Sequence, residues 1–476
     1  CGPTGLAAEQ LKDLFFAVGS GQLLDALSAI VSTLASGRAA DFTRPYLGGA
    51  RLIAIAKKEP GSLRPIAIGE ILRRLTSKVM LARSLHACKK VLGANQFGVG
   101  IPNGAERIAH CLRRRSHTTC KGFVYVKFDL RNAFNSGDRA KILDAVQRLA
   151  PELLPWVQWT YGVDSNLFFG AHVIPSSEGV QQGDPLGPLL FSLLIRDVLH
   201  ELDTLGLDVN LWYLDDGIIG GSVDDVLRAT TLIRTRFLDL GLVINDAKTE
   251  VVTIDDGINV AETFGPKFTH LHRNFTALGT PIGDDTFVAD FVLRKSVAKA
   301  KTVVAHLRAL PSPHVRYTLL RQCVVFSPLV HLLRTVRPSA MEAPSRTYDS
   351  IIRSAFADLM GGYTLSDRAW MQASLGVKSG GLGFRSAHDH RHAAFLASAA
   401  TCAELDDTDT TDDVDHAVDV VAHEHAASGR QHELVFPDHQ RLVAHGPQLH
   451  VRSIAMCAIS PSVTLYLANG KICRAS

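Results

Sequence analysis

The sequence predicts an α+β fold, and three observations support this prediction. Short runs rich in β-branched and aromatic residues, such as Phe123–Phe128, stand between turn residues and predict strands. Between these runs, apolar residues recur every three or four positions, a spacing that predicts amphipathic helices. Beyond about residue 284 only the helical spacing persists, so we expect a mixed first part and a helical second part.

Composition limits the classes of protein to which the chain belongs. With 476 residues it is long enough to bury two or three cores, so we expect several domains. It is 46% hydrophobic and 20% charged, with neither a membrane-spanning run nor a signal peptide, so we expect an intracellular protein without membrane association. Its eight cysteines lack the close pairing of a disulfide framework or a zinc site. Because the chain begins with Cys1 rather than Met, we expect further sequence upstream.

Basic residues are concentrated between Arg51 and Lys90. This stretch holds ten lysines and arginines but only two acidic residues, Glu59 and Glu70. The net charge of +3 is too small to indicate a nucleic-acid partner, whereas a local cluster of this kind offers a surface for a polyanion. A solvated face without a partner is the alternative, and the sequence leaves both open.

The elements of the first half follow from periodicity and turn residues. Helical spacing occupies residues 6–42, 70–91 and 105–115, and extended runs occupy 51–57, 63–68 and 123–128. Residues 98–104 form a glycine-rich loop. The carboxylate Asp129 comes directly after the last of these strands.

Later elements place two more acids in a tight turn. Helical patterns at 139–160 and 188–205 are separated by a stretch rich in Pro, Ser and Gly, which predicts a loop. Residues 209–213 and 217–220 then form two strands joined through Leu214, Asp215 and Asp216. A helix over 223–240 ends at Gly241, and strands lie near Val251 and Leu278.

Asp129, Asp215 and Asp216 are the candidate metal ligands. Nucleotidyl transfer uses two divalent ions about 3.5–4 Å apart, held by carboxylates that separate strands bring together. One acid at a strand end and two in a hairpin turn would meet if their strands were neighbours in one sheet. An aspartate pair in a turn is common by itself, so the prediction depends on the surrounding sequence.

The surrounding sequence resembles that of reverse transcriptases. Tyr213-Leu-Asp-Asp216 resembles the Tyr-x-Asp-Asp signature, and residues 128–135 resemble the first palm motif. Residues 177–191 resemble the second palm motif in the form typical of non-LTR retrotransposons. Residues 241–249 are similar to the motif that carries a family lysine, and 278–283 to the primer-grip hairpin. Five motifs in the family's order make this resemblance specific over about 51–283.

The resemblance implies a role for each matching residue. Asp129 and Asp215 would hold two Mg²⁺ ions, with Mn²⁺ as a substitute, and Asp216 would assist them. Lys248 would protonate the leaving pyrophosphate. Arg64 would clamp the triphosphate by its forked donors, and Lys57 or Lys58 would add a charge beside it. The nucleotide and template would lie against Gln182, Gly183 and Tyr213, where glycine permits close backbone approach.

Phe134 distinguishes two classes of polymerase. It lies where reverse transcriptases carry an aromatic ring that excludes a ribose 2′-hydroxyl, whereas viral RNA polymerases typically carry a polar group there. The resemblance therefore implies an RNA-directed DNA polymerase that uses an RNA template, a DNA primer and deoxynucleotides, within a retrotransposon polyprotein. A domesticated palm that only binds RNA and a viral RNA-dependent RNA polymerase are the alternatives.

The resemblance also implies a right-hand polymerase with fingers, an antiparallel-sheet palm and a helical thumb. We expect a helical segment over 1–50, fingers and palm over 51–283, and a helical thumb over 284–400. Residues 401–476 would form an extension whose role the sequence does not indicate. It contains an acidic, low-complexity stretch at 404–415, for which we expect a solvated loop.

Overall fold

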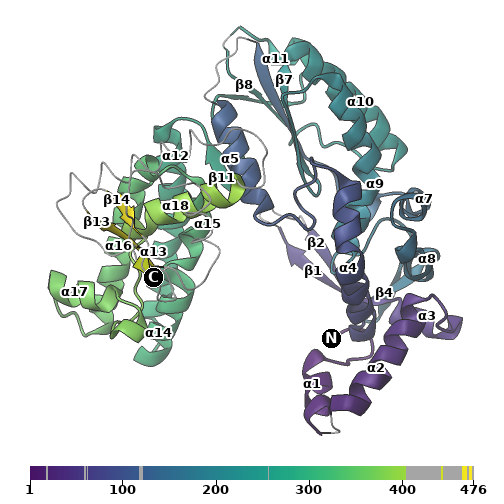
Figure 1. Ribbon diagram of the computed structural model, residues 1–476, viewed down its shortest axis with the longest axis horizontal. Coiled ribbons are helices and arrows are strands. Elements are labelled where there is room, and N and C mark those ends of the chain that lie inside the picture. The colour runs from purple at the N-terminus through teal and green to yellow at the C-terminus, as the bar shows by residue number, and fades with distance from the viewer. Residues whose placement is uncertain are drawn as a thin grey trace. The chain divides into compact units, whose positions relative to one another are not determined.

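The computed structural model describes residues 1–17, 20–57, 61, 63–116, 122–255, 257–403, 441–442, 464–468 and 471–473. The chain forms two compact units. The first contains residues 1–104 and 119–272, and the second contains residues 105–118 and 273–476. Figure 1 shows the elements of both units in chain order by colour.

A five-stranded sheet is the centre of the first unit. Its strand order is β6-β7-β3-β8-β9, and every neighbouring pair is antiparallel except β8 and β9. Five of the six side chains of the central strand β3 are buried, so both faces of the sheet are covered along this strand. The strands are β3 (Phe123–Phe128), β6 (Val209–Tyr213), β7 (Asp216–Ser222), β8 (Glu250–Thr253) and β9 (Thr269–His272).

Helices of the first unit bury their apolar faces in one core. Trp156 and Trp212 are the largest fully buried side chains of this core. The predicted helix over 223–240 is confirmed as α10, after which Gly241 takes a positive φ of 77°. The main helices are α4 (Ile71–Leu92), α7 (Arg139–Leu149), α8 (Leu154–Tyr161), α9 (Gly187–Leu202) and α10 (Val223–Asp239).

A second sheet of the first unit corrects one prediction. Its order is β2-β1-β4-β5, with strands β1 (Ala50–Ala56), β2 (Leu63–Gly69), β4 (Ser165–Phe169) and β5 (His172–Ser176). The sequence predicts only a loop between the helices at 139–160 and 188–205, and the β4–β5 hairpin within this stretch shows that the prediction is wrong. Parallel pairing of β4 with β1 adds this hairpin to the sheet, and local composition carries no signal of so distant a partner.

The remaining elements of the first unit are short or N-terminal. The helical prediction for the N-terminal residues is confirmed by α1 (Ala8–Ala17) and α2 (Ser20–Ala35). The others are η1 (Asp41–Thr43), α3 (Arg44–Leu47), α6 (Ala133–Ser136), η2 (Pro151–Leu153), η3 (Asp203–Leu205) and α11 (Val260–Thr263).

The second unit is mainly helical, as predicted, and has its own core around Met341, Tyr348 and Phe384. A hairpin of β10 (Phe275–Ala277) and β11 (Thr280–Ile282) precedes the helices and turns through Leu278 and Gly279, both at positive φ. The helices are α5 (Gly104–Ser116), α12 (Asp285–Val292), α13 (Ala298–Arg308), α14 (Pro313–Leu319), α15 (Val330–Thr335), α16 (Pro338–Leu359), α17 (Asp367–Ser374) and α18 (Ala387–Ala403).

Short helical segments and strands complete the second unit. Two five-residue π-helical segments, η4 (Leu293–Val297) and η5 (Leu320–Val324), adjoin α13 and α14. The shorter elements are η6 (Ser327–Leu329), η7 (Val377–Ser379), β12 (Arg441–Leu442), β13 (Thr464–Ala468) and β14 (Lys471–Cys473). The acidic stretch at 404–415, predicted to be a solvated loop, lies outside the described residues.

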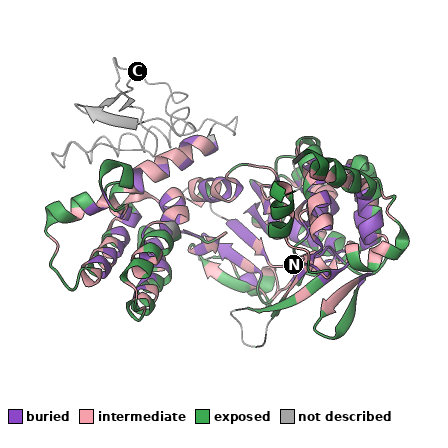
Figure 2. Ribbon diagram, turned by 90° about the horizontal axis from the view of Figure 1, so that it is seen from below, coloured by how far each residue is buried: buried purple, intermediate pink, exposed green. Residues whose placement is uncertain are grey.

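The pattern of burial differs between the helices and the inner strands. Figure 2 shows helices with one buried and one exposed face, whereas the inner strands are buried along most of their length. No helix in the described part of the chain combines the length and the apolarity that crossing a membrane requires.

Candidate active site

Three carboxylates lie at one end of the five-stranded sheet. Asp129 follows the last residue of β3, and Asp215 occupies the two-residue turn between β6 and β7. Asp216 begins β7, and the pairing of Phe128 with Gly217 places Asp129 and Asp216 at adjacent strand ends. Strand pairing thus brings together acids separated by more than 80 positions in the sequence.

Burial and neighbouring negative charges change the ionisation of Asp215 and Asp216. Burial raises the pKa of Asp215, and the negative charge of Asp129 raises it further, while Arg64 acts in the opposite direction. Asp216 keeps contact with solvent, yet loss of hydration and then repulsion by Asp215 raise its pKa to about 6. A bound cation would relieve this repulsion.

Hard oxygen ligands of this kind suit divalent cations such as Mg²⁺. Among the residues that the structure describes, no group of three or more His, Cys, Asp or Glu side chains is gathered closely enough to hold a metal ion alone. Mg²⁺ is commonly bound by one or two carboxylates together with substrate phosphates, so a site completed by substrate is consistent with this arrangement.

Asp129 is oriented by two residues that the sequence analysis did not single out. The side-chain Nδ2 of Asn245 donates to Oδ2 of Asp129 at 2.8 Å, and the backbone N of Asn245 donates to the Asp129 carbonyl at 2.8 Å. The backbone N of Asp129 donates to Oγ1 of Thr249 at 3.3 Å. Asn245 and Thr249 flank Lys248 in the motif at 241–249, so this motif also fixes a carboxylate.

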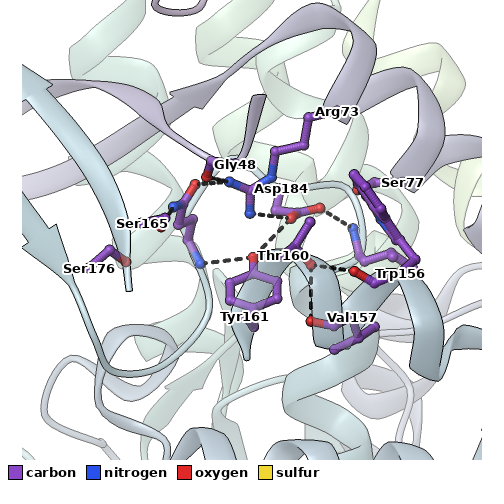
Figure 3. Close-up of polar contacts among 12 residues, drawn as sticks. Gly48, Arg73, Ser77, Trp156, Val157, Thr160, Tyr161, Ser165, Ser176 and Asp184 are labelled. Atoms are coloured by element: carbon purple, nitrogen blue, oxygen red, sulfur yellow. Dashed lines mark hydrogen bonds and ion pairs between the residues drawn. The ribbon is translucent and has the colours of Figure 1, made fainter. Parts of the chain in front are cut away.

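A buried ion pair connects α4 to the loop before α9. Arg73 and Asp184 are 3.0 Å apart, with side chains only 1% and 2% exposed. Arg73 also donates to Oε1 of Gln181 at 2.8 Å. The hydroxyl of Tyr161 donates to Asp184 at 2.8 Å, and Figure 3 shows this bond beside the Arg73–Asp184 pair. These bonds compensate for the loss of hydration of both charges. The sequence predicts Arg73 on a basic surface, and its burial corrects that prediction.

Gln182 and Gly183 lie against strand β2. The backbone N of Ala67 donates to the carbonyl of Gln182 at 2.8 Å. Gly183 has a φ of 128°, and a Cβ at this position would lie 2.4 Å from the carbonyl oxygen of Ala67. Close packing of the loop on β2 therefore requires glycine here.

The other predicted site residues occupy different surroundings. The ring of Phe134 is half-buried and stacks on Phe191, with 4.8 Å between ring centroids. Tyr213 is half-buried at the end of β6, where it pairs with Asp216. Lys248 is exposed. Arg64 is exposed on β2, close enough to Asp215 to lower the pKa of that carboxyl.

The sequence of this region matches a known family. Residues 55–282 match the family described as reverse transcriptase (RNA-dependent DNA polymerase). This match covers the strands and turns that carry Asp129, Asp215 and Asp216. The chain carries a reverse transcriptase domain. The resemblance inferred from the five motifs is thereby confirmed.

Curated relatives of this domain are retrotransposon proteins. The retrotransposable element SLACS 132 kDa protein of Trypanosoma brucei gambiense is 29% identical over 219 residues, 44% of this chain and 18% of that protein. The Pol polyprotein of retrotransposable element R2 from Nasonia vitripennis is 27% identical over 161 residues, 30% of this chain and 15% of that protein. The corresponding R2 polyprotein of Popillia japonica is 26% identical over 231 residues, 41% of this chain and 30% of that protein. The chain thus spans less than a third of the length of these relatives.

The chain also has solved structural neighbours. The alignment with a structure of telomerase from Candida albicans in complex with a fragment of telomeric RNA covers 83% of this chain and 68% of the telomerase chain, at 11% identity and a TM-score of 0.42. Apo telomerase from Candida tropicalis covers 78% of this chain and 68% of its own, at 11% identity and a TM-score of 0.43. The mixed sheets, the helices and the family match confirm the predicted α+β polymerase fold.

Proposed function

We propose that this chain is an RNA-directed DNA polymerase, part of a retrotransposon polyprotein, which copies an RNA template from a DNA primer. The observation that carries the proposal is the convergence of Asp129, Asp215 and Asp216 at one sheet end within a reverse transcriptase domain. Family membership alone would fit a palm that has lost its activity. The retention of all three carboxylates favours the active enzyme.

Reverse transcriptases use divalent metal ions, and we assign two Mg²⁺ ions to this site, with Mn²⁺ as a substitute. Asp129 and Asp215 would hold both ions, and Asp216 would add negative charge beside them. When bound, the ions would neutralise charge on the reacting phosphate oxygens. Burial raises the pKa of both Asp215 and Asp216, and repulsion by Asp129 and by Asp215, respectively, raises it further. These shifts support the assignment, because a bound cation would stabilise the charged form of both carboxylates.

Other residues would bind the substrates. Arg64 would contact the triphosphate of the incoming nucleotide, since its charge already acts on Asp215. Gln182 and Gly183 would lie beside the nucleotide and template, and Tyr213 would support the catalytic turn. Lys248 would donate a proton to the leaving pyrophosphate. Phe134 would exclude a 2′-hydroxyl, since its ring is stacked on Phe191 and held in place.

We also propose the domain roles suggested by the motifs. The segment 51–283 would supply fingers and palm, 284–400 the thumb, and 1–50 a helical entry segment. Exposed basic residues on the helices after 284, among them Arg294, Lys299 and Lys301, support a role in holding a nucleic-acid duplex.

Primer extension tests the proposed function. A poly(A) template with an oligo(dT) primer is supplied with Mg²⁺ and labelled dTTP or UTP. Incorporation of dTTP supports the proposal, whereas incorporation of UTP supports a viral-type RNA polymerase. RNA binding without any product supports a palm that only binds RNA, and either of these two results would overturn the proposal.

Asp215→Asn should reduce extension at least about 100-fold, because it removes the charge of a metal ligand in a site where charge stabilises the reaction. RNA binding, measured by fluorescence anisotropy, should remain near that of the wild type. Asp239→Asn is the matched control, since Asp239 is an exposed aspartate at the end of α10, and it should leave extension unchanged. Undiminished extension by Asp215→Asn would refute the assignment of the metal site.

A further inference from the structure

The segment 95–98 lies alongside strand β6, next to the turn that carries Asp215. The backbone N of Phe97 donates to the carbonyl of Trp212 at 2.7 Å, and the backbone N of Trp212 donates to the carbonyl of Asn95 at 2.8 Å. Gln96 and Trp212 form an isolated parallel bridge. The segment that leads into the glycine-rich loop at 98–104 therefore extends the sheet at its β6 edge.

Within this segment, the side chain of Gln96 binds the turn directly. Gln96 is only 1% exposed. Its Oε1 accepts hydrogen bonds from the backbone N of Leu214 at 2.8 Å and of Gly98 at 3.0 Å. Its Nε2 donates to the carbonyl of Leu214 at 3.4 Å. One amide side chain thus binds both backbone polar groups of the residue before Asp215.

Leu214 needs such a restraint. It has a φ of 59°, in the left-handed region that residues other than glycine rarely adopt. Strained backbone of this kind persists where the surroundings hold it in place, and it occurs preferentially at functional sites. The hydrogen bonds from Gln96 supply this restraint at the residue whose conformation directs Asp215.

The segment is itself anchored on both sides. Nδ2 of Asn95 donates to Oδ1 of Asp203 at 2.5 Å, and Nδ2 of Asn210 on β6 donates to the same oxygen at 3.0 Å. A Cβ at Gly98 would lie 2.6 Å from Cγ of Leu214 and 2.8 Å from its backbone N. The loop therefore has a fixed position and packs directly against the turn.

We propose that Gln96 is a positioning residue for catalysis, which holds the turn Leu214-Asp215 in the conformation that presents the carboxylates to metal ions. This proposal rests on the proposed polymerase function. It assigns the role to the buried amide side chain and not to general packing, because Gln96 makes three directed hydrogen bonds in and around the turn.

Gln96→Met tests the proposal, because methionine has a similar shape and loses the hydrogen bonds. We expect kcat for dTTP incorporation to fall about tenfold or more, on the scale of one or two lost hydrogen bonds, while KM for dTTP changes less than about threefold. Independently of activity, amide hydrogen exchange in the peptide 209–216 should accelerate about tenfold. Gln96→Glu retains the oxygen acceptor, so exchange in this peptide should return toward that of the wild type.

Two controls distinguish positioning from general destabilisation. Gln147→Met changes an exposed glutamine on α7 and should alter neither readout. Val226→Ala truncates a fully buried side chain on α10 and should lower the melting temperature. It should not selectively accelerate amide hydrogen exchange in the peptide 209–216. Gly98→Ala disturbs the same turn sterically and should also lower kcat, which provides a second test if Gln96→Met folds poorly.

Several results would overturn the proposal. A wild-type kcat in Gln96→Met and Gly98→Ala would do so, even if exchange were faster. An equal loss of kcat in Val226→Ala at matched stability would also do so, because the effect would then be general. Failure of the wild type to extend a primer would instead overturn the proposed function, and the positioning role with it.

Discussion

At the scale of single residues, the end of the five-stranded sheet that carries the three carboxylates holds negative charge at a cost to stability. Asp129, Asp215 and Asp216 lie at adjacent strand ends, and the pKa of Asp216 is raised to about 6 by loss of hydration and by repulsion from Asp215. The folded protein therefore retains a proton on Asp216 at a pH where the unfolded chain, with an ordinary aspartate pKa of about 3.9, has released it. The ionised form of Asp216 thus lowers the stability of the folded protein.

The pH dependence of stability should show this opposition. Below about pH 3 both states are protonated and Asp216 has almost no effect, whereas well above pH 6 the full penalty applies. In EDTA, Asp216→Asn should therefore melt at a higher temperature than the wild type at about pH 7.5 and at nearly the same temperature at about pH 3. Thermal unfolding followed by circular dichroism measures both.

Asp13→Asn, at an exposed position on α1, is the matched control and should show no such pH-dependent gain. Equal melting temperatures of wild type and Asp216→Asn at the higher pH would contradict this account of the site.

At the scale of elements, the site depends on how the loop before α9 meets strand β2. The Ala67–Gln182 hydrogen bond of 2.8 Å and the glycine at 183 set this contact, and the Arg73–Asp184 ion pair fixes the loop from the other side. Gln182 thereby has a defined position relative to β2 and α4.

Gly183→Ala should disrupt the packing of the loop before α9 on strand β2. A Cβ there would lie 2.4 Å from a backbone oxygen, so the loop or β2 must shift. We expect the free energy of unfolding to fall by about 2 kcal/mol more than in Gly170→Ala, on the scale of overpacking a close contact. Chemical denaturation measures this difference, and extension activity should fall with it.

Gly170 is the matched control because it also has a positive φ, 59°, but no atoms lie within 4 Å of the point that an added Cβ would occupy. The φ of Gly170 lies in the left-handed region that alanine can adopt, whereas the φ of 128° at Gly183 lies outside it, so Gly183→Ala adds both backbone strain and the close contact. Equal losses in the two variants would contradict the close packing assigned to position 183.

At the scale of the whole molecule, the chain enters the second unit twice. Helix α5 belongs to the second unit, although its sequence lies between two segments of the first. Glu106 on α5 accepts from Nε of Arg334 at 2.7 Å and from its Nη2 at 2.8 Å, and also from Oγ of Ser398 at 2.7 Å. The cluster of Glu106, Arg334 and Ser398 thus connects α5 to α15 and α18 by hydrogen bonds.

Glu106→Gln should destabilise the second unit by about 1–3 kcal/mol at neutral pH, because it breaks a bidentate, partly buried ion pair. Burial by itself would raise the pKa of Glu106, and the hydrogen bonds from Arg334 and Ser398 outweigh it and lower the pKa. The carboxylate's stabilisation is therefore fully present above its unfolded pKa of about 4.3 and is lost as the pH falls through the lower folded value. Calorimetry should show the difference from wild type shrinking as the pH falls below about 4.

Asp290→Asn on α12 removes an exposed pair with Arg294 in the same unit and should cost less than about 0.5 kcal/mol. An equally small effect of Glu106→Gln would contradict the role given to this cluster.

The sequence by itself predicted the features that depend on local spacing. The strand at 123–128, the two acids in a hairpin turn and the helix that stops at Gly241 all follow from periodicity and turn residues. The five ordered motifs predicted the family that the comparison confirms. These signals are local because each depends on residues within one element or turn.

Tertiary structure alone decided the features that depend on distant partners. The β4–β5 hairpin pairs with β1 across more than 100 residues. Arg73 is buried where it pairs with Asp184, which lies 111 positions away in the sequence. Gln96 reaches Leu214 across 118 positions, and α5 joins the second unit through Arg334, 228 positions from Glu106. Local spacing cannot encode such pairs, because burial and hydrogen bonding between distant segments are settled only when the whole chain packs.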